Sequence, residues 1–254
     1  MLTRAKAEAA QRPRRFYKIA EPGPVEGGFG VLLDGRPVRT PAGVRMVLPT
    51  PAVAQLVAGE WEAQAEHIVI DDMPAARLAF TAIDRAPQAR EEVAAEIARH
   101  AGSDVLCYFA DGPDVLVERE GAQWEPMLQW ARQDLGLELI HVAGLMHRPQ
   151  PEAMLERARA LALELGDFEL TGLVNAAGLY GSAVLAFAVH RGRLSGQEAF
   201  DLSRLDEAFQ EDRWGVDEEA AARTANMRRE AGVLEQWFQA LNDPHIPSSP
   251  GLTG

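Results

Sequence analysis

The sequence predicts an α+β protein, in which a small N-terminal antiparallel β-sheet domain with one packed helix is followed by a larger all-helical domain. Two observations lead to this fold class. Turn signals between short apolar runs are concentrated before residue 50, whereas apolar residues recur at helical spacing after residue 87. A chain of 254 residues can bury a core in both parts. We therefore predict an α+β domain over 1–86, a helical domain over 87–241 and a loose tail over 242–254.

The segment 29–50 has the turn signals of a three-stranded meander. Asp34-Gly35 lies between two apolar runs, and this dipeptide accepts the positive φ angles that a type I′ hairpin requires. Residues 15–20 are expected to supply a further strand. Pro37 is expected at an edge or a bulge, because proline cannot donate a ladder hydrogen bond.

A helix over 51–65 follows, with Thr50 as its N-cap and Pro51 at its first position. Trp61 shares an apolar stripe with the valines of this helix, so we assign it mainly to packing against the sheet. Beyond it we expect a strand over 67–70 and a short helix or turn over 73–85.

The remainder of the chain has almost only helical patterns. A capping box formed by Ser195 and Glu198 starts one of these helices. The expected helices cover 87–101, 124–135, 151–165, 170–189, 195–213 and 218–241, with one short strand within 137–144.

The segment 170–189 contains twenty residues without a charge, which is the length of a membrane span. It also contains three glycines and four polar side chains. Small residues allow close helix packing, so we interpret this segment as one helix buried at the centre of the helical domain.

The overall charge narrows the choice of partners. A formal net charge of −13 argues against nucleic acid and anionic membranes. The single cysteine excludes an internal disulfide and fits a reducing compartment, either the bacterial cytoplasm or, for a eukaryotic chain, the mitochondrial matrix. Six basic side chains among the first 18 residues are interpreted as a basic arm, with a mitochondrial presequence as the alternative.

The usual signatures of cofactor chemistry are missing from the sequence. It contains no GxxxxGK[ST] motif, and neither of its two lysines follows a glycine-rich turn. The six histidines have no i, i+3 or i+4 spacing that would aim two imidazoles at one ion. We therefore expect no cofactor, no metal and no catalytic residue.

One candidate nucleophile needs separate treatment. Cys107 lies within the apolar run VLCYF, and His100 precedes it by seven residues. A catalytic thiol needs a base and an electropositive, partly exposed setting. The apolar neighbours favour a buried cysteine, and a thiol-dependent hydrolase that uses Cys107 and His100 remains as an alternative.

An acidic stretch is the best candidate for a functional surface. Eight acids and two arginines lie between residues 200 and 220, together with two aromatic residues. Aromatic side chains beside charged ones are typical of protein-binding surfaces. Glu207 and Glu211 are expected on one exposed helix face, near Arg204 and Trp214, and these four residues form the predicted partner site. A merely solvated helix face is the alternative.

Seven motifs in order resemble the F-type ATP synthase assembly chaperones that bind the alpha subunit of the catalytic head. They are GFGVLLDGRPVRTPAG, EWEAQ, MPAARLAFTAIDR, AGSDVLCYF, WEPMLQWA, HRPQP and LDEAFQEDRWG. The resemblance extends from about residue 14 to residue 235. It implies two domains, no enzymatic activity, and binding of the free alpha subunit until that subunit pairs with beta. It also implies a chain that is monomeric when free. A binding scaffold without such a client remains a further alternative.

Overall fold

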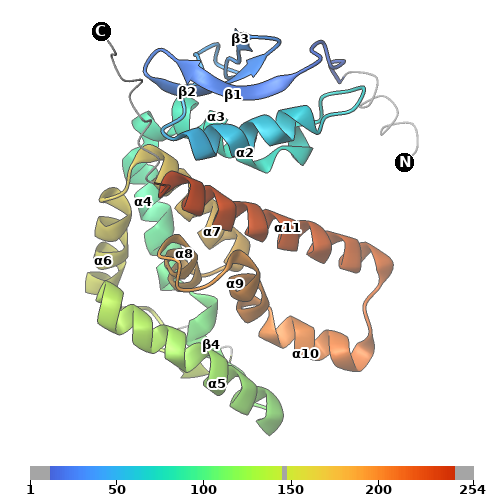
Figure 1. Cartoon of the computed structure of the whole chain (residues 1–254). Coiled ribbons are helices and arrows are strands. Elements are labelled where there is room, and N and C mark those ends of the chain that lie inside the picture. Colours follow the sequence, from blue (N-terminus) through green and yellow to red (C-terminus); the bar gives the residue numbers. More distant parts are fainter. Residues whose placement is uncertain (1–11, 145–147, 244–254) are drawn as a thin grey trace, which may run out of the picture. The chain divides into compact units, whose positions relative to one another are not determined.

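The computed structural model describes residues 12–144 and 148–243, and these form two compact units. The first unit contains the residues up to Asp84 together with those from Gln239 onward, and the second contains Arg85–Phe238. The small antiparallel sheet in the first unit and the mostly helical second unit confirm the predicted fold class (Figure 1). The basic N-terminal arm to residue 11 and most of the predicted tail lie outside the described residues.

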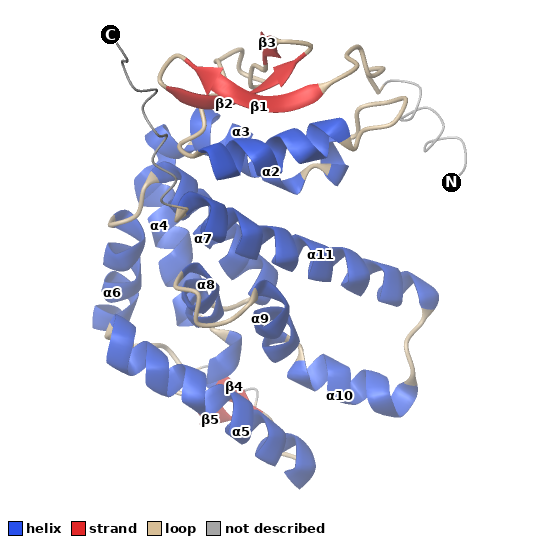
Figure 2. Cartoon of the chain, in the orientation of Figure 1, coloured by secondary structure: helices blue, strands red, loops and turns tan. Residues whose placement is uncertain are grey.

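The first unit places a three-stranded sheet against two helices (Figure 2). The sheet is antiparallel, in the order β1-β2-β3. The strands are β1 Ala20–Val25, β2 Gly28–Leu33 and β3 Arg36–Pro37; they are followed by α2 Pro51–Glu62, the short 3₁₀ turn η1 Ile70–Asp72 and α3 Pro74–Asp84.

The turn chemistry of this unit follows the sequence. Asp34 (φ 48°) and Gly35 (φ 78°) form the predicted tight turn between β2 and β3. The Thr50 side chain accepts a hydrogen bond of 3.1 Å from the Val53 amide, which confirms it as the N-cap of α2. Pro37 lies in the edge strand β3, as expected.

Three strand predictions for this unit are wrong. The first strand runs over Ala20–Val25 instead of 15–20. Its two prolines are two residues apart, so they lack N–H groups on the same edge, which a border strand tolerates. The third strand of the meander is reduced to isolated bridges at Arg45 and Leu48, and segment 67–70 contributes one bridge at His67.

The EWEAQ motif holds the first unit together through hydrogen bonds. The Glu60 carboxylate accepts hydrogen bonds of 2.8 Å from the amides of Ala75 and Ala76 and thereby caps the start of α3. Burial raises the pKa of Glu60 to about 7 despite these bonds. Glu62 accepts from the Ala20 amide at 2.7 Å, at the start of β1. Trp61 is buried, which confirms its expected role in packing.

Within the described residues, the second unit contains eight α-helices and several short elements. The helices are α4 Ala86–Gly102, α5 Asp114–Trp130, α6 Glu152–Leu163, α7 Asp167–Tyr180, α8 Ala183–His190, α9 Gly196–Ser203, α10 Leu205–Trp214 and α11 Glu218–Leu241, the last of which continues into the first unit. The short elements are the 3₁₀ turn η2 Val105–Cys107, the π-helical turn η3 Ala131–Leu135, and the parallel strands β4 Tyr108–Phe109 and β5 Val142–Ala143.

Two segments that were predicted as single helices are each broken into two. The uncharged stretch is divided at Gly181, which adopts a left-handed conformation (φ 62°) before Ser182 caps α8. Its largely buried side chains confirm the interpretation as core, although it is not one helix. Among the described residues, no helix is long and apolar enough to cross a membrane. The stretch 195–213 has the predicted capping box but is interrupted at Arg204 (φ −122°).

Asp104 connects the η2 turn to α8. Its buried carboxylate accepts hydrogen bonds from the amides of Leu106 at 3.2 Å and Val184 at 3.0 Å, and burial raises its pKa to about 6. A close contact then fixes α9 against α11, because any side chain at Gly196 would overlap the carbonyl of Ala231.

Candidate functional site

The most distinctive surface of the second unit is the α10–α11 corner, defined here as residues 204–219. Figure 1 shows α10 and the first half of α11 extending away from the other helices of this unit, joined by a short link. The corner contains seven acids and two arginines. The described part of α11 buries side chains only from Ala231 onward, so its first half faces solvent.

The inner face of α10 attaches the corner to the unit. Leu205 and Phe209 are buried, one helical turn apart, as their spacing predicted. The Arg213 guanidinium lies 4.2 Å from the centre of the Phe209 ring and covers it in a cation–π contact. α10 also packs against α5. These contacts hold the opposite face of α10 toward solvent.

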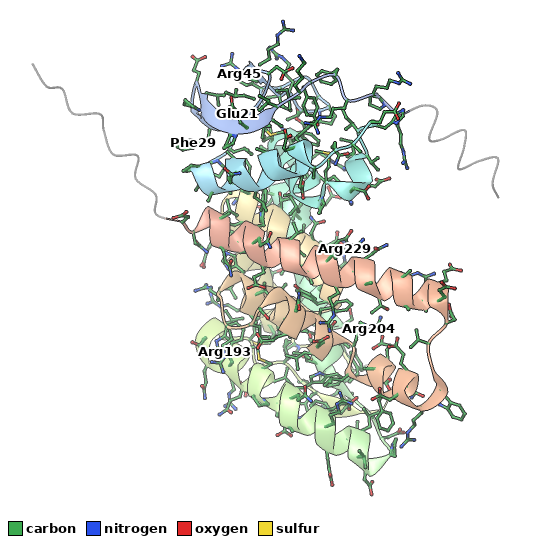
Figure 3. The ribbon with its side chains drawn as sticks, turned by 45° about the vertical axis from the view of Figure 1, so that its right-hand side comes forward. Glu21, Phe29, Arg45, Arg193, Arg204 and Arg229 are labelled. Atoms are coloured by element: carbon green, nitrogen blue, oxygen red, sulfur yellow. The ribbon has the colours of Figure 1, made fainter. Side chains whose placement is uncertain are left out.

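Glu207 and Glu211, which were predicted to share an exposed face, differ in their exposure and in their pairing. Arg204 pairs with Glu211 at 2.7 Å, and the two side chains are only 22% and 31% exposed. Figure 3 shows Arg204 at the junction of α9 and α10, and from this N-cap position it pairs with Glu211 further along α10. Glu211 therefore has a structural partner, and the expectation of an exposed Glu211 is wrong. Glu207 is exposed, and it makes no hydrogen bond or ion pair with any described residue.

Trp214 ends α10 with its side chain 82% exposed. Gly215 (φ 79°) then turns the chain, and Val216 is also exposed. The Asp217 carboxylate accepts a hydrogen bond of 2.9 Å from the Ala220 amide and so caps the start of α11. Sequence reasoning missed Val216, although the Trp-Gly-Val order, with glycine at the turn, was the signal that could have found it.

The corner combines two chemical properties on one projecting surface. A large exposed indole offers an apolar anchor, and most of its acidic neighbours are exposed: Asp206, Glu207, Asp212, Asp217, Glu218 and Glu219. Aromatic anchors supply much of the binding energy at protein interfaces, while surrounding charges steer the approach of a partner. This arrangement can bind a protein surface that is apolar and basic.

The other candidate, Cys107, is in an unsuitable environment for catalysis. Its side chain is 1% exposed, and burial together with the nearby Asp104 carboxylate raises the pKa of the thiol. Burial lowers the pKa of His100. A catalytic cysteine needs the opposite, a thiol pKa lowered by neighbouring cations. In the part of the chain that the structure describes, no three His, Cys, Asp or Glu side chains are grouped so that they could hold a metal ion.

Comparison with known proteins gives a consistent result at three levels. Residues 14–132 match the family model described as ATP12 chaperone protein. The mitochondrial protein atp12 of Schizosaccharomyces pombe is 25% identical over 219 residues, which is 82% of this chain and 75% of that protein.

Two crystal structures from bacteria are similar over most of the chain. Atp12 from Paracoccus denitrificans is 38% identical, with a TM-score of 0.83 over 90% of this chain and 98% of that one. A protein from Agrobacterium tumefaciens is 39% identical, with a TM-score of 0.83 over 90% of this chain and 86% of that one.

Both the fold and these similarities define the class of the protein as an assembly chaperone of ATP synthase. Within this class, the chain belongs to the ATP12 chaperone family. This confirms the family resemblance of its seven motifs.

Proposed function

We propose that the chain binds the free alpha subunit of F-type ATP synthase and holds it until the subunit pairs with beta. The α10–α11 corner provides the contact, with Trp214 as the apolar anchor and Glu207 as the main charged group. Arg204 and Glu211 contribute by fixing the start of α10 through their ion pair. The activity is binding and release, so it requires neither a cofactor nor a catalytic residue.

One observation carries the proposal, namely that Trp214 is 82% exposed on the same helix as Glu207, an exposed glutamate that has no partner among the described residues. Folding gains nothing from an indole left in water, since the hydrophobic effect favours its burial. A second molecule that covers Trp214 would gain this burial. The six exposed acids of the corner favour a basic partner surface and disfavour acidic ones.

The needs of the client are consistent with such a surface. An alpha subunit that belongs in a ring between beta subunits exposes interface surface when it is alone, and such surface tends to self-associate. A chaperone must cover it and then yield to the beta subunit. We infer that the chain acts in the bacterial cytoplasm, as a monomer when free of its client.

The test is to measure binding of purified alpha subunit to the full chain and to two corner variants, Trp214→Ala and Glu207→Lys. Each variant should weaken binding by about fivefold or more, since interface anchors commonly contribute more than ~1 kcal/mol. The Glu207→Lys effect should be larger at low salt, where charge repulsion is less screened. Both variants should melt within about 2 °C of the unmodified chain, because exposed substitutions change stability by less than ~0.5 kcal/mol.

Glu92→Lys is the matched control, because it makes the same charge change at an exposed position of α4 outside the corner. It should bind alpha subunit as the unmodified chain does. If Trp214→Ala and Glu207→Lys both suppress alpha-subunit aggregation normally, the corner is not the contact. If the unmodified chain does not bind purified alpha subunit, the proposed client itself is wrong.

A further inference from the structure

A second feature that suggests a ligand lies in the first unit, and it shares no residue with the corner. It is a groove of about 510 Å³, within the range of about 300–1,000 Å³ that is typical of ligand sites. Its apolar lining includes Phe16, Tyr17, Leu33, Pro37, Val38 and Trp61. The Phe16 side chain is 73% exposed although it is fully apolar. Neighbouring Ile19 is 58% exposed.

The charged part of the lining is predominantly positive. Asp34, Arg36 and Arg39 line the groove. The Asp34 carboxylate already accepts hydrogen bonds from the Ile19 and Lys18 amides at 3.0 and 3.1 Å, and these bonds hold the pKa of Asp34 below its usual value. Arg36 is exposed and forms no ion pair with a described residue. A positive rim is unusual in a chain with a net charge of −13.

One of the lining residues, Trp61, has a donor without a described acceptor. The residue is 7% exposed, and its Nε1 makes no hydrogen bond with any described residue. Its backbone, in contrast, is engaged, because the Trp61 carbonyl accepts a hydrogen bond of 2.6 Å from the Tyr17 hydroxyl. A buried N–H without an acceptor is costly, and native structures rarely retain one. No described residue supplies this acceptor, so the bonding capacity of Nε1 is unfilled in the described part of the chain.

We propose that this groove binds an extended client segment that combines large apolar side chains with acidic ones. One apolar side chain fills the space beside Phe16 and Tyr17, an acidic side chain pairs with Arg36, and a carbonyl of the segment accepts from Trp61 Nε1. The proposal rests on the proposed function, because it takes the client to be the alpha subunit. It adds a second contact that differs in chemistry from the acidic corner.

The position of the groove beside a sheet edge favours a peptide over a compact ligand. The edge strand β3 contributes Arg36 and Pro37 to the lining, and extended peptides commonly bind beside a sheet edge. Nε1 exposes less than 1 Å², so the bound carbonyl reaches it only when a rim side chain moves. Phe16 is the side chain that the proposal takes to move, because it lines the same groove, is exposed, and has an edge contact with Tyr17 at 5.4 Å.

The test uses a fluorescent peptide of about twelve residues, in which leucine and phenylalanine alternate with glutamate and serine. Its binding to the full chain is followed by fluorescence anisotropy. Arg36→Glu should weaken binding by about tenfold, since like charges would then face each other. Phe16→Ser and Trp61→Phe should each weaken it by about fivefold, through lost apolar contact and through loss of the N–H donor.

Arg45→Glu is the matched control. Arg45 lies in the same unit but does not line the groove, and in Figure 3 it points away from the sheet on the side opposite α2. Its ion pair with the highly exposed Glu26 contributes little to stability. This variant should bind the peptide within about twofold of the unmodified chain. A peptide in which lysine replaces glutamate should bind at least tenfold more weakly, by roughly the same charge argument.

Addition of purified alpha subunit should displace the bound peptide. Equal peptide affinity for the unmodified chain, Arg36→Glu and Phe16→Ser would overturn the proposal. These two positions are exposed, so they decide the outcome even if Trp61→Phe fails to fold. Alpha subunit that binds the chain without displacing the peptide would also overturn it. If alpha subunit does not bind at all, the proposed client is wrong, and the peptide measurements alone decide whether the groove is a binding site.

Discussion

The segment around Cys107 and the α10–α11 corner both contain polar side chains that attract functional interpretation, but they use them in opposite ways. In the first segment, the Asp104 carboxylate is completely buried and both its oxygens accept backbone hydrogen bonds. At the corner, Glu207 and Trp214 are exposed, and neither makes a hydrogen bond or an ion pair with another described residue. A polar side chain thus stabilises the fold when its hydrogen-bonding groups are already paired, as in Asp104. It is available to a partner when they are unpaired and exposed, as in Glu207.

The largest effect that follows from this comparison is on the buried side. Asp104→Ala leaves the amides of Leu106 and Val184 buried without their acceptor. Each such amide costs about 1–3 kcal/mol, so we expect a loss of about 2–6 kcal/mol in the free energy of unfolding. For a chain of this size, each kcal/mol corresponds to about 2–4 °C in melting temperature. Thermal unfolding followed by circular dichroism measures the shift.

Ser103→Ala is the control for Asp104→Ala. Ser103 is the preceding residue, but it is exposed and its hydroxyl donates only a long bond of 3.3 Å to the Arg99 carbonyl. Its melting temperature should change by less than about 2 °C. Equal melting temperatures for Asp104→Ala and Ser103→Ala would show that the buried hydrogen bonds of Asp104 do not stabilise the fold.

The pH dependence of the first unit gives a second test on the buried side. Glu60 has its pKa raised from 4.5 to about 7 by burial. Its stabilising contribution is therefore fully present below its unfolded pKa of 4.5 and is lost as the pH rises through 7. The glutamine in Glu60→Gln cannot ionise, so this variant does not lose stability in that way. Its melting temperature should therefore rise relative to that of the unmodified chain between pH 5 and pH 8.

The difference in melting temperature between Glu60→Gln and the unmodified chain reports on the titration of Glu60, because the two proteins share all other titrating groups. Glu62→Gln serves as a control of opposite sign, since the Ala20 amide and Arg15 lower the pKa of Glu62. Its difference from the unmodified chain should not grow above pH 5. A constant difference between Glu60→Gln and the unmodified chain from pH 5 to pH 8 would show that Glu60 titrates normally.

A smaller effect is expected at Cys107. Cys107→Ala removes one buried heavy atom and should cost about 1 kcal/mol, or somewhat more, by leaving a small cavity. Alpha-subunit binding should be unchanged. A bulky maleimide should label the native protein slowly and the unfolded protein rapidly, because only unfolding exposes the thiol. Rapid labelling of the native protein would contradict the burial of this side chain.

Much of the fold could be predicted because its signals are local. Thr50 with Pro51 marked the start of α2, and Asp34-Gly35 marked the hairpin. The helix breaks at Gly181 and Arg204 were missed, since apolar spacing continues across both and the capping box indicates only where a helix begins. β1 was missed because prolines disfavour a strand unless it lies at a sheet border, which is a property of the whole sheet.

The candidate site was only partly predictable, for a similar reason. Local spacing identified the inward residues Leu205 and Phe209 and the acidic character of the segment. It could not show that Arg204 pairs with Glu211, because these residues are seven apart, beyond the usual i, i+4 neighbours. The exposure of Trp214 depends on the direction that α11 takes after Gly215, which no local pattern specifies.

The smallest expected effects on stability distinguish the two glutamates of the corner, Glu207 and Glu211. Glu211→Gln removes the charge that pairs with Arg204, and the pair is partly exposed, so the stability loss should be about 0.2–1 kcal/mol. Glu207→Gln removes a charge without a described partner and should leave the melting temperature unchanged. A double-mutant cycle between Arg204→Ala and Glu211→Gln should give a coupling energy of that same size, about 0.2–1 kcal/mol.

The effects on alpha-subunit affinity should be the reverse of those on stability, with the larger loss for Glu207→Gln. Glu207→Gln should weaken binding by about twofold to fivefold, because its carboxylate is available to a partner. Glu211→Gln should change affinity less, because its carboxylate is already paired with Arg204 and acts only through the position of α10. Both variants make the same chemical change four residues apart on one helix, so each is a control for the other. If Glu211→Gln reduced affinity more than Glu207→Gln at equal melting temperatures, the partner would have to displace Arg204, and the ion pair would belong to the binding surface.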